Sequence, residues 1–170
     1  MNRAKPRISF EYFPPKTAEG KEKLHTETTP ELNALGPEFF SVTYGAGGTT
    51  RESTAGVVCA MLEVGIEVAP HLSFGGDEET AIAELLDLYR DRGIRRLVAL
   101  RGDRPSGMGG LAQLVYASEL VAFIRERSGD HFEIEVAAYP EIPNDRLDEE
   151  LTARRTGSYL GFGRAIGVID

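Results

Sequence analysis

Short runs in which bulky apolar side chains alternate with small or polar ones recur along the chain, and longer segments of helical periodicity separate them. We predict strands at Arg7–Phe13, Phe39–Tyr44, Val68–Phe74, Arg96–Arg101 and Glu133–Tyr139. We predict helices at Ala18–Leu35, Glu52–Val64, Glu78–Arg92 and Leu111–Arg127. In the third helix, apolar residues recur at the i, i+3, i+4, i+7 spacing of one helix face. Strands that alternate with helices in this way indicate parallel βαβ units.

Each predicted strand carries two sets of side chains, because successive residues point to opposite faces. The bulky set comprises Ile8, Phe10, Tyr12, Phe40, Val42, Tyr44, Leu72, Phe74, Val98, Leu100, Ile134 and Val136. The small or polar set comprises Ser9, Glu11, Ser41, Thr43, Ala69, His71, Ser73, Ala99, Arg101, Asp103, Ala137 and Tyr139. A doubly wound sheet is covered by helices on both faces, so both sets should then be apolar.

A (β/α) barrel explains this asymmetry, since the bulky set would pack under the helices and the other set would point into the lumen. The predicted fold class is therefore α/β, as a partial (β/α) TIM-type barrel of about five parallel strands and four helices. A flavodoxin-like sheet is the structural alternative that the pattern leaves open.

The charge balance and the cysteine count narrow the range of partners. The 170 residues carry a net charge of −8 without any Lys/Arg-rich run, which disfavours nucleic acid and anionic membrane surfaces. The single cysteine, Cys59, allows no internal disulfide, and no Cys/His spacing predicts a metal site. No signal peptide pattern and no apolar stretch of about 20 residues is present, so we expect a cytoplasmic protein.

Five segments, taken together and in this order, resemble methylenetetrahydrofolate reductases. They are Ser9–Lys16 (SFEYFPPK), Ser41–Arg51 (SVTYGAGGTTR), Ala69–Ser73 (APHLS), Leu97–Asp103 (LVALRGD) and Val136–Glu141 (VAAYPE). Each segment alone is weak evidence, but their common order makes the resemblance specific over roughly residues 7–141. The resemblance implies a (β/α)₈ barrel that binds FAD.

The resemblance also implies an activity and a substrate. Members of the family pass a hydride from NADH or NADPH through the flavin to 5,10-methylenetetrahydrofolate, and they form 5-methyltetrahydrofolate for one-carbon metabolism and methionine biosynthesis. The cofactor carries the hydride chemistry, while the protein orients and tunes it.

Two carboxylates match the family's catalytic positions. Glu11 resembles the general acid that protonates the folate so that its methylene bridge opens, a role for which a raised pKa in a low-dielectric lumen is suited. Asp103 resembles the aspartate beside the flavin and the pterin. A carboxylate there would disfavour the anionic reduced flavin and favour a cationic folate intermediate.

Further positions match residues that contact FAD in the family. They are Thr43, His71, Leu100, Arg101, Gly102, Asp103, Tyr116, Ala117, Ala137 and Tyr139. Arg101 could pair with phosphate, and Gly102 would allow close approach of the backbone. Leu100 belongs to the bulky set, so we expect any contact from it to be made by its backbone.

The resemblance stops after Glu141, where Ile142-Pro143-Asn144 stands in place of the family's histidine and proline. We therefore divide the chain into an incomplete barrel, 1–141, and a divergent tail, 142–170, for which poor order is one expectation. A complete barrel takes about 250 residues. An open half-barrel leaves a strand edge unpaired, and it could close by forming a homo-oligomer, persist as an open sheet or fail to fold stably.

Three hypotheses about function follow. The chain could be a reductase that uses FAD and a reduced nicotinamide, a non-catalytic flavin-binding or assembly fragment, or the product of a decayed gene. The first predicts a flavin-containing protein that oxidises the nicotinamide, the second predicts flavin binding without turnover, and the third predicts unfolded protein.

Overall fold

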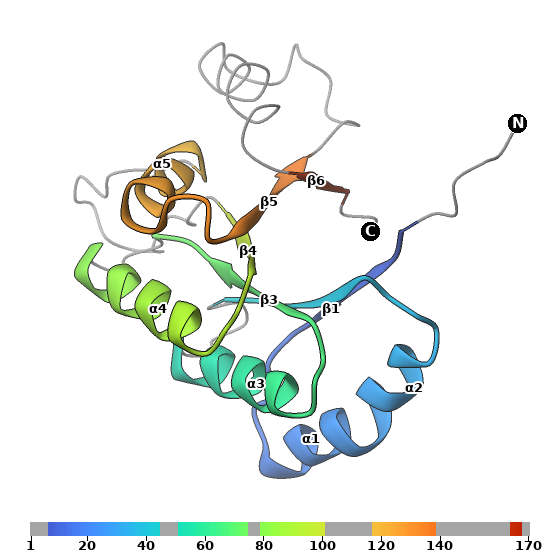
Figure 1. The fold of residues 1–170 in the computed structure, drawn as a ribbon. Helices are drawn as coiled ribbons and strands as arrows, with labels where there is room; N and C mark the ends of the chain where they lie inside the picture. The colour runs from blue at the N-terminus through green and yellow to red at the C-terminus, as the bar shows by residue number, and fades with distance from the viewer. Residues whose placement is uncertain (1–6, 45–50, 75–78, 101–116, 139–163, 168–170) are drawn as a thin grey trace, which may run out of the picture. The chain divides into compact units, whose positions relative to one another are not determined.

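The computed structural model describes residues 7–44, 51–74, 79–100, 117–138 and 164–167. The chain divides into two compact units, Met1–His71 and Leu72–Asp170. Each unit combines parallel strands with helices (Figure 1).

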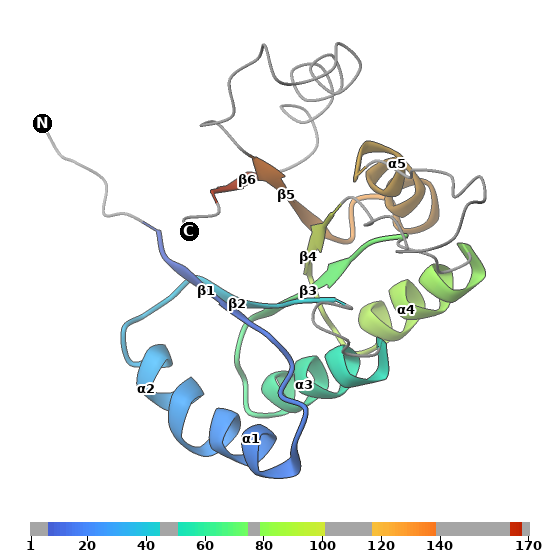
Figure 2. The same ribbon diagram turned by 180° about the vertical axis from the view of Figure 1, so that it is seen from behind.

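The first unit alternates strands and helices along the chain. Its elements are β1 (Ser9–Tyr12), α1 (Ala18–Lys23), the π-helix η1 (Leu24–Thr28), α2 (Thr29–Asn33), β2 (Phe39–Val42), α3 (Arg51–Glu63) and β3 (Val68–Leu72), whose last residue opens the second unit. β2 pairs in parallel with β1 on one edge and with β3 on the other. Figures 1 and 2 show α1, α2 and α3 on one side of these strands.

The strand order in this unit decides between the two predicted architectures. A flavodoxin-like sheet places β1 between β2 and β3, whereas β2 is the central strand here. Right-handed crossovers that always step in the same direction put every helix on one face. The α/β fold class and the (β/α) barrel type of winding are thus confirmed.

The two sets of side chains predicted for the first unit are also confirmed. Phe10 pairs in register with Phe40, and Tyr12 pairs with Val42, so the bulky set shares one face. The Phe40 ring centroid lies 5.8 Å from that of Phe10 and 5.3 Å from that of Tyr12, which stacks on it. On the other face Glu11 lies opposite Ser41.

The first predicted helix, Ala18–Leu35, is divided into three segments. Thr17 caps α1, because its hydroxyl accepts the Gly20 N–H at 3.0 Å. Pro30 has no N–H and its ring crowds the carbonyl four residues earlier, so an unbroken α-helix is disfavoured there. The chain adopts a π-helical turn before Pro30 in place of that helix, with the Thr29 N–H bonded to the Leu24 carbonyl.

The second unit contains two helices and the remaining strands. Its elements are α4 (Glu79–Asp91), β4 (Arg96–Ala99), α5 (Ala117–Ser128), β5 (Glu133–Ala138) and β6 (Arg164–Gly167). β5 pairs in parallel with β4 and with β6. β6 was not predicted, because it falls in the part of the chain where the resemblance is lost; most of that tail lies outside the described residues.

The register of β4 corrects one part of the sequence prediction. Val98 lies opposite Glu135, and Ala99 lies opposite Val136. Val98 and Leu100 were assigned to the face of Ile134 and Val136, and this assignment is wrong. Every residue of β4 is buried, so its alternation between apolar and polar residues carried little information.

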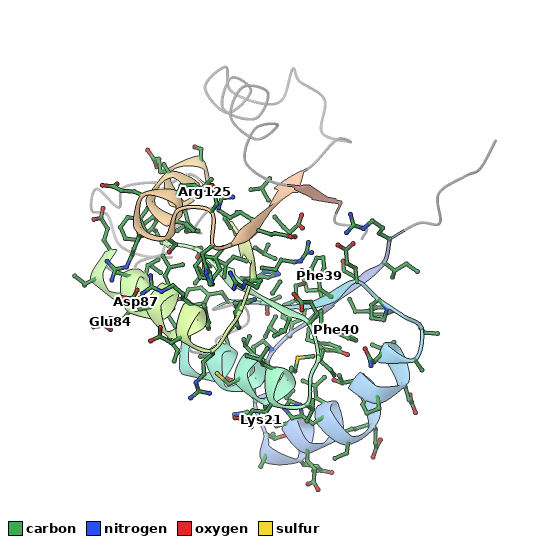
Figure 3. All side chains as sticks on the ribbon, in the orientation of Figure 1. Lys21, Phe39, Phe40, Glu84, Asp87 and Arg125 are labelled. Atoms are coloured by element: carbon green, nitrogen blue, oxygen red, sulfur yellow. The ribbon has the colours of Figure 1, made fainter. Side chains whose placement is uncertain are left out.

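Apolar stripes attach the helices of the second unit. Ile82, Leu85, Leu86 and Tyr89 of α4 are buried as predicted. Asp87 of α4, labelled in Figure 3, pairs with Arg127 of α5 and also with Arg90 at 2.8 Å. This contact joins two helices that lie side by side in both ribbon views. Among the described residues, no helix has both the length and the apolar character that crossing a membrane would require.

Candidate functional site

The predicted site residues are distributed over both units and the undescribed segments. Glu11, Thr43 and His71 belong to the first unit, and Leu100, Ala117 and Ala137 belong to the second. Five of the six lie within or directly after strands that run parallel within each unit, and Ala117 begins a helix. The other predicted positions lie outside the described residues: Arg101, Gly102, Asp103, Tyr116 and Tyr139.

Glu11 and His71 come together on the polar face of the first unit. Glu11 Oε2 lies 3.3 Å from His71 Nε2. The imidazole is almost fully buried, with 5% of its side chain exposed, while 43% of the Glu11 side chain is exposed. His71 Nε2 has no hydrogen-bond acceptor in line with it among the described residues, so the contact is one of charge and proximity.

Ser41 of β2 lies between these two residues in the sheet. It pairs with Glu11 on one side and with Ala69, two residues before His71, on the other. The His71 ring nitrogen beside the carboxylate holds the pKa of Glu11 below its ordinary value; partial burial opposes this effect, and the Ser41 hydroxyl adds to it. The raised pKa expected for Glu11 is therefore not found in the ligand-free chain, because the carboxylate is half open to water and faces a polar partner.

Thr43 presents a buried hydroxyl directly after β2. Its N–H donates to the Tyr12 carbonyl at 2.9 Å, and its carbonyl accepts the Thr54 hydroxyl at 2.8 Å. These two bonds tie the backbone of Thr43 to β1 and α3. Thr43 Oγ1 is buried and has no hydrogen-bond partner among the described residues. A buried hydroxyl of this kind is suited to a polar group of a ligand, so Thr43 and His71 fit a cofactor such as FAD.

The second unit places its predicted residues at the carboxyl ends of its strands and at the start of α5. Leu100 follows β4, and its N–H donates to the Leu72 carbonyl at 2.9 Å. That donor is already used, so a backbone contact to a ligand would have to come from the Leu100 carbonyl. Ala117 begins α5 and is buried, and Ala137 lies in β5 one residue before its end.

Sequence reasoning missed a charged cluster within β4 and β5. Arg96 lies 2.8 Å from a Glu133 carboxylate oxygen and 2.5 Å from one of Glu135. Arg96 and Glu135 are both buried, and they share a face with Val98. The available signal was the alternation of Glu133 and Glu135 around Ile134, which places both acids on one face of β5. The cluster neutralises buried charge and holds the two strands together.

No metal site is formed by the described residues, in which no group of three or more histidine, cysteine or acidic side chains gathers. Cys59 is a free, half-buried thiol on α3.

Comparisons with known proteins identify what the chain resembles. The family model described as "Methylenetetrahydrofolate reductase" matches residues 1–155, so the match continues past Glu141. A 5,10-methylenetetrahydrofolate reductase of Pectobacterium carotovorum is 42% identical over 136 residues, which are 79% of this chain and 44% of that protein. The protein of the same name from Escherichia coli is 40% identical over the same shares. Methylenetetrahydrofolate reductase (NADH) 1 of Zea mays is 40% identical over 84% of this chain and 25% of its own length.

The chain thus spans less than half the length of the bacterial relatives and about a quarter of the plant protein. Among solved structures, a Family GH13_31 enzyme aligns with 95% of this chain and 51% of its own at a TM-score of 0.45 and 11% identity, a likeness too low to bear on function.

Proposed function

Because this chain belongs to the methylenetetrahydrofolate reductase family, we propose that it carries the proton-donating side of a flavin-dependent reductase site. The reaction would reduce 5,10-methylenetetrahydrofolate to 5-methyltetrahydrofolate with a reduced nicotinamide, in one-carbon metabolism and methionine biosynthesis of the cytoplasm. The observation that carries this proposal is Glu11, a half-exposed carboxylate on the strand face that also bears His71 and Thr43.

Glu11 would be the general acid. Its side chain combines access for a ligand with a neighbouring imidazole, that of His71, at 3.3 Å. A folate seated against Glu11 would remove water from the carboxyl group and favour its neutral, proton-donating form. Asp103 is proposed for the second catalytic position on the strength of its match to the family motif.

The flavin, when bound, would take up the hydride of the nicotinamide and deliver it to the folate. Thr43 would hold one part of it in the first unit through its buried hydroxyl, and the buried His71 ring on the same strand face would pack beside it. Leu100, Ala117 and Ala137 would contribute in the second unit, together with the motif residues Arg101, Gly102, Tyr116 and Tyr139. The maize relative is named for NADH, which makes NADH the first donor to test, with NADPH beside it.

A second candidate function is a non-catalytic flavin-binding or assembly fragment. The observation in its favour is the share of the relatives that the chain covers, 44% of the bacterial proteins. Such a fragment would bind flavin through Thr43 and His71 and would need a partner, a second copy of the chain or another polypeptide, before hydride transfer occurred.

One preparation distinguishes these functions. The purified chain is reconstituted with FAD, and bound flavin is measured by absorbance after gel filtration. NADH and NADPH oxidation are then followed without oxygen, with an electron acceptor and with methylenetetrahydrofolate. Bound flavin with nicotinamide oxidation supports the reductase, bound flavin without it supports the fragment, and absence of bound flavin rejects both. The elution volume also reports whether the chain forms a homo-oligomer.

A further inference from the structure

Glu11 has a charge state that conflicts with its proposed role. An acid must hold a proton when it acts, but the neighbouring His71 favours the ionised carboxylate. The same neighbour is itself a base that can carry a proton, and its Nε2 atom is the one that faces Glu11 Oε2. The two side chains therefore form a unit in which one proton can occupy either partner.

The position of that proton depends on access to water. With 43% of the Glu11 side chain exposed, water solvates the carboxylate, so the charged form of Glu11 is favoured before a ligand covers it. A ligand that covers Glu11 removes this solvation. An ion pair without water is costly compared with a neutral acid beside a neutral imidazole, and the balance then shifts toward the neutral pair.

We propose that His71 is a positioning residue that stores the catalytic proton, and that covering Glu11 with substrate moves this proton from His71 Nε2 to Glu11 Oε2. The inference rests on the proposed function and deepens it. One N–H bond breaks and one O–H bond forms, so the imidazolium becomes neutral and the carboxylate becomes a carboxylic acid. Glu11 then gives this proton to the folate, and solvent returns one to the pair after product leaves.

The surroundings in the first unit permit this transfer. The neighbours of Glu11 on the same face are Ser9 on β1 and Ser41 on β2, with Thr43 beyond, and all three are neutral. Among the described residues, His71 is the one ionisable group that acts on the pKa of Glu11. His71 Nε2 lies 3.3 Å from Glu11 Oε2 and has no other hydrogen-bond partner among the described residues, so no competing bond of that atom has to break when the proton moves.

The first experiment uses the ligand-free chain and needs no activity. Nuclear magnetic resonance follows the Glu11 carboxyl carbon and the His71 ring nitrogens against pH. In His71→Gln, Glu11 should take up its proton at a higher pH than in the wild type. In Glu11→Gln, His71 should hold its proton less readily, because the carboxylate that favours its charged form is gone. His25→Gln is the matched control, since His25 lies on η1, away from the pair, and should move neither titration.

The second experiment measures folate reduction against pH at saturating FAD. Before substrate binds, the last proton of the wild-type pair would sit on His71, whereas in His71→Gln it can sit only on Glu11. The alkaline limb of kcat/KM, which reports the pair before substrate covers it, should therefore move to lower pH in His71→Gln, and kcat/KM at neutral pH should fall. His25→Gln should keep the wild-type limb.

The outcomes separate this inference from the proposed function. Folate reduction with an unmoved alkaline limb in His71→Gln overturns the proton store and leaves the reductase standing. Absence of reciprocal shifts in the ligand-free chain also overturns the proton store, and the Glu11→Gln arm gives this result even if His71→Gln does not fold. A third outcome is that the variants show the reciprocal shifts but the wild-type chain forms no methyltetrahydrofolate. That result overturns both the catalytic role of the pair and the proposed function.

Discussion

Glu11 on β1 and His71 on β3 meet across the intervening strand β2, with Oε2 3.3 Å from Nε2. Ser41 occupies the intervening position as the register partner of Glu11. Three parallel strands thus contribute one side chain each to a polar cluster of Glu11, Ser41 and His71, which lies on the face away from the helices. The distance between Glu11 and His71 depends on the register of both strand pairs.

Replacing Ser41 with alanine should raise the pKa of Glu11. The Ser41 hydroxyl helps to hold that pKa below its ordinary value, but its contribution is smaller than that of His71. We therefore expect Ser41→Ala to move the Glu11 titration upward by less than His71→Gln does. A carboxyl-carbon titration checks this order, and an equal or larger effect of Ser41→Ala would contradict it.

Thr43 and Thr54 form a matched pair that separates ligand binding from stability. Thr43→Val removes a hydroxyl that has no partner among the described residues, so the free energy of unfolding should change by less than about 1 kcal/mol. Flavin affinity should fall about fivefold, the equivalent of about 1 kcal/mol for one hydrogen bond.

Thr54→Val instead removes the donor to the Thr43 carbonyl inside the protein. It should lower the free energy of unfolding by about 1–3 kcal/mol. Urea unfolding and flavin fluorescence titration measure the two effects. Wild-type flavin affinity in Thr43→Val would remove Thr43 from the proposed cofactor site.

The fold was predictable wherever side-chain alternation and helical spacing were strong. In the first unit, Phe10, Tyr12, Phe40 and Val42 separate cleanly from Glu11 and Ser41, and the observed register follows this division. The facing of the β4 side chains was not predictable, because both faces of this strand are buried. Leu97 and Val98 are both apolar, so hydrophobic alternation cannot assign them to different faces. The π-helical turn before Pro30 reflects backbone sterics that hydrophobic periodicity does not record.

The sequence proposed the members of the candidate site, but it did not predict the contacts between them. The family motifs identified Glu11, Thr43 and His71, and the alternation placed them on one face. The proximity of Glu11 and His71 depends on the offset between β1 and β3, which no local pattern specifies. The lowered pKa of Glu11 follows from this proximity and from the exposure of the carboxylate, so it emerged only with the structure.

Removal of the Arg96 guanidinium should destabilise the second unit. Arg96→Met leaves the buried Glu135 carboxylate without the cation at 2.5 Å, and the free energy of unfolding should fall by about 3–5 kcal/mol. Replacing both residues, as Arg96→Met with Glu135→Leu, should recover much of that loss.

Glu133→Gln provides the control for this cluster, because its side chain is 65% exposed and contacts the same guanidinium at 2.8 Å. Its effect should stay below about 1 kcal/mol. Chemical denaturation of the variants measures all three effects. A similar loss of unfolding free energy in Glu133→Gln and Arg96→Met would show that burial does not determine how much each ion pair contributes.

The ion pair between Asp87 and Arg127 should make stability depend on pH in the acid range. Arg127, with help from Arg90, lowers the pKa of Asp87 in the folded chain. A carboxyl whose folded pKa is lowered contributes stability above its unfolded pKa and loses it as the pH falls through the folded value. Asp87→Asn should therefore be less stable than the wild type at neutral pH, and the difference should shrink below about pH 4.

Glu84 lies exposed on the same helix (Figure 3), and Glu84→Gln controls for the change in net charge. Thermal unfolding at several pH values, repeated at high salt, measures the contribution of the pair. A wild-type advantage over Asp87→Asn that persists unchanged at low pH would contradict the assignment.

The formation of methyltetrahydrofolate by the FAD-reconstituted chain, compared between the wild type and Glu11→Gln, tests the central claim most directly. The reduced nicotinamide is supplied with methylenetetrahydrofolate, and both its oxidation and the folate product are quantified. The wild type is predicted to form product, and Glu11→Gln is predicted to oxidise the nicotinamide without forming it. Equal product from both proteins, or loss of both reactions in the variant, would contradict the assignment of Glu11 as the proton donor.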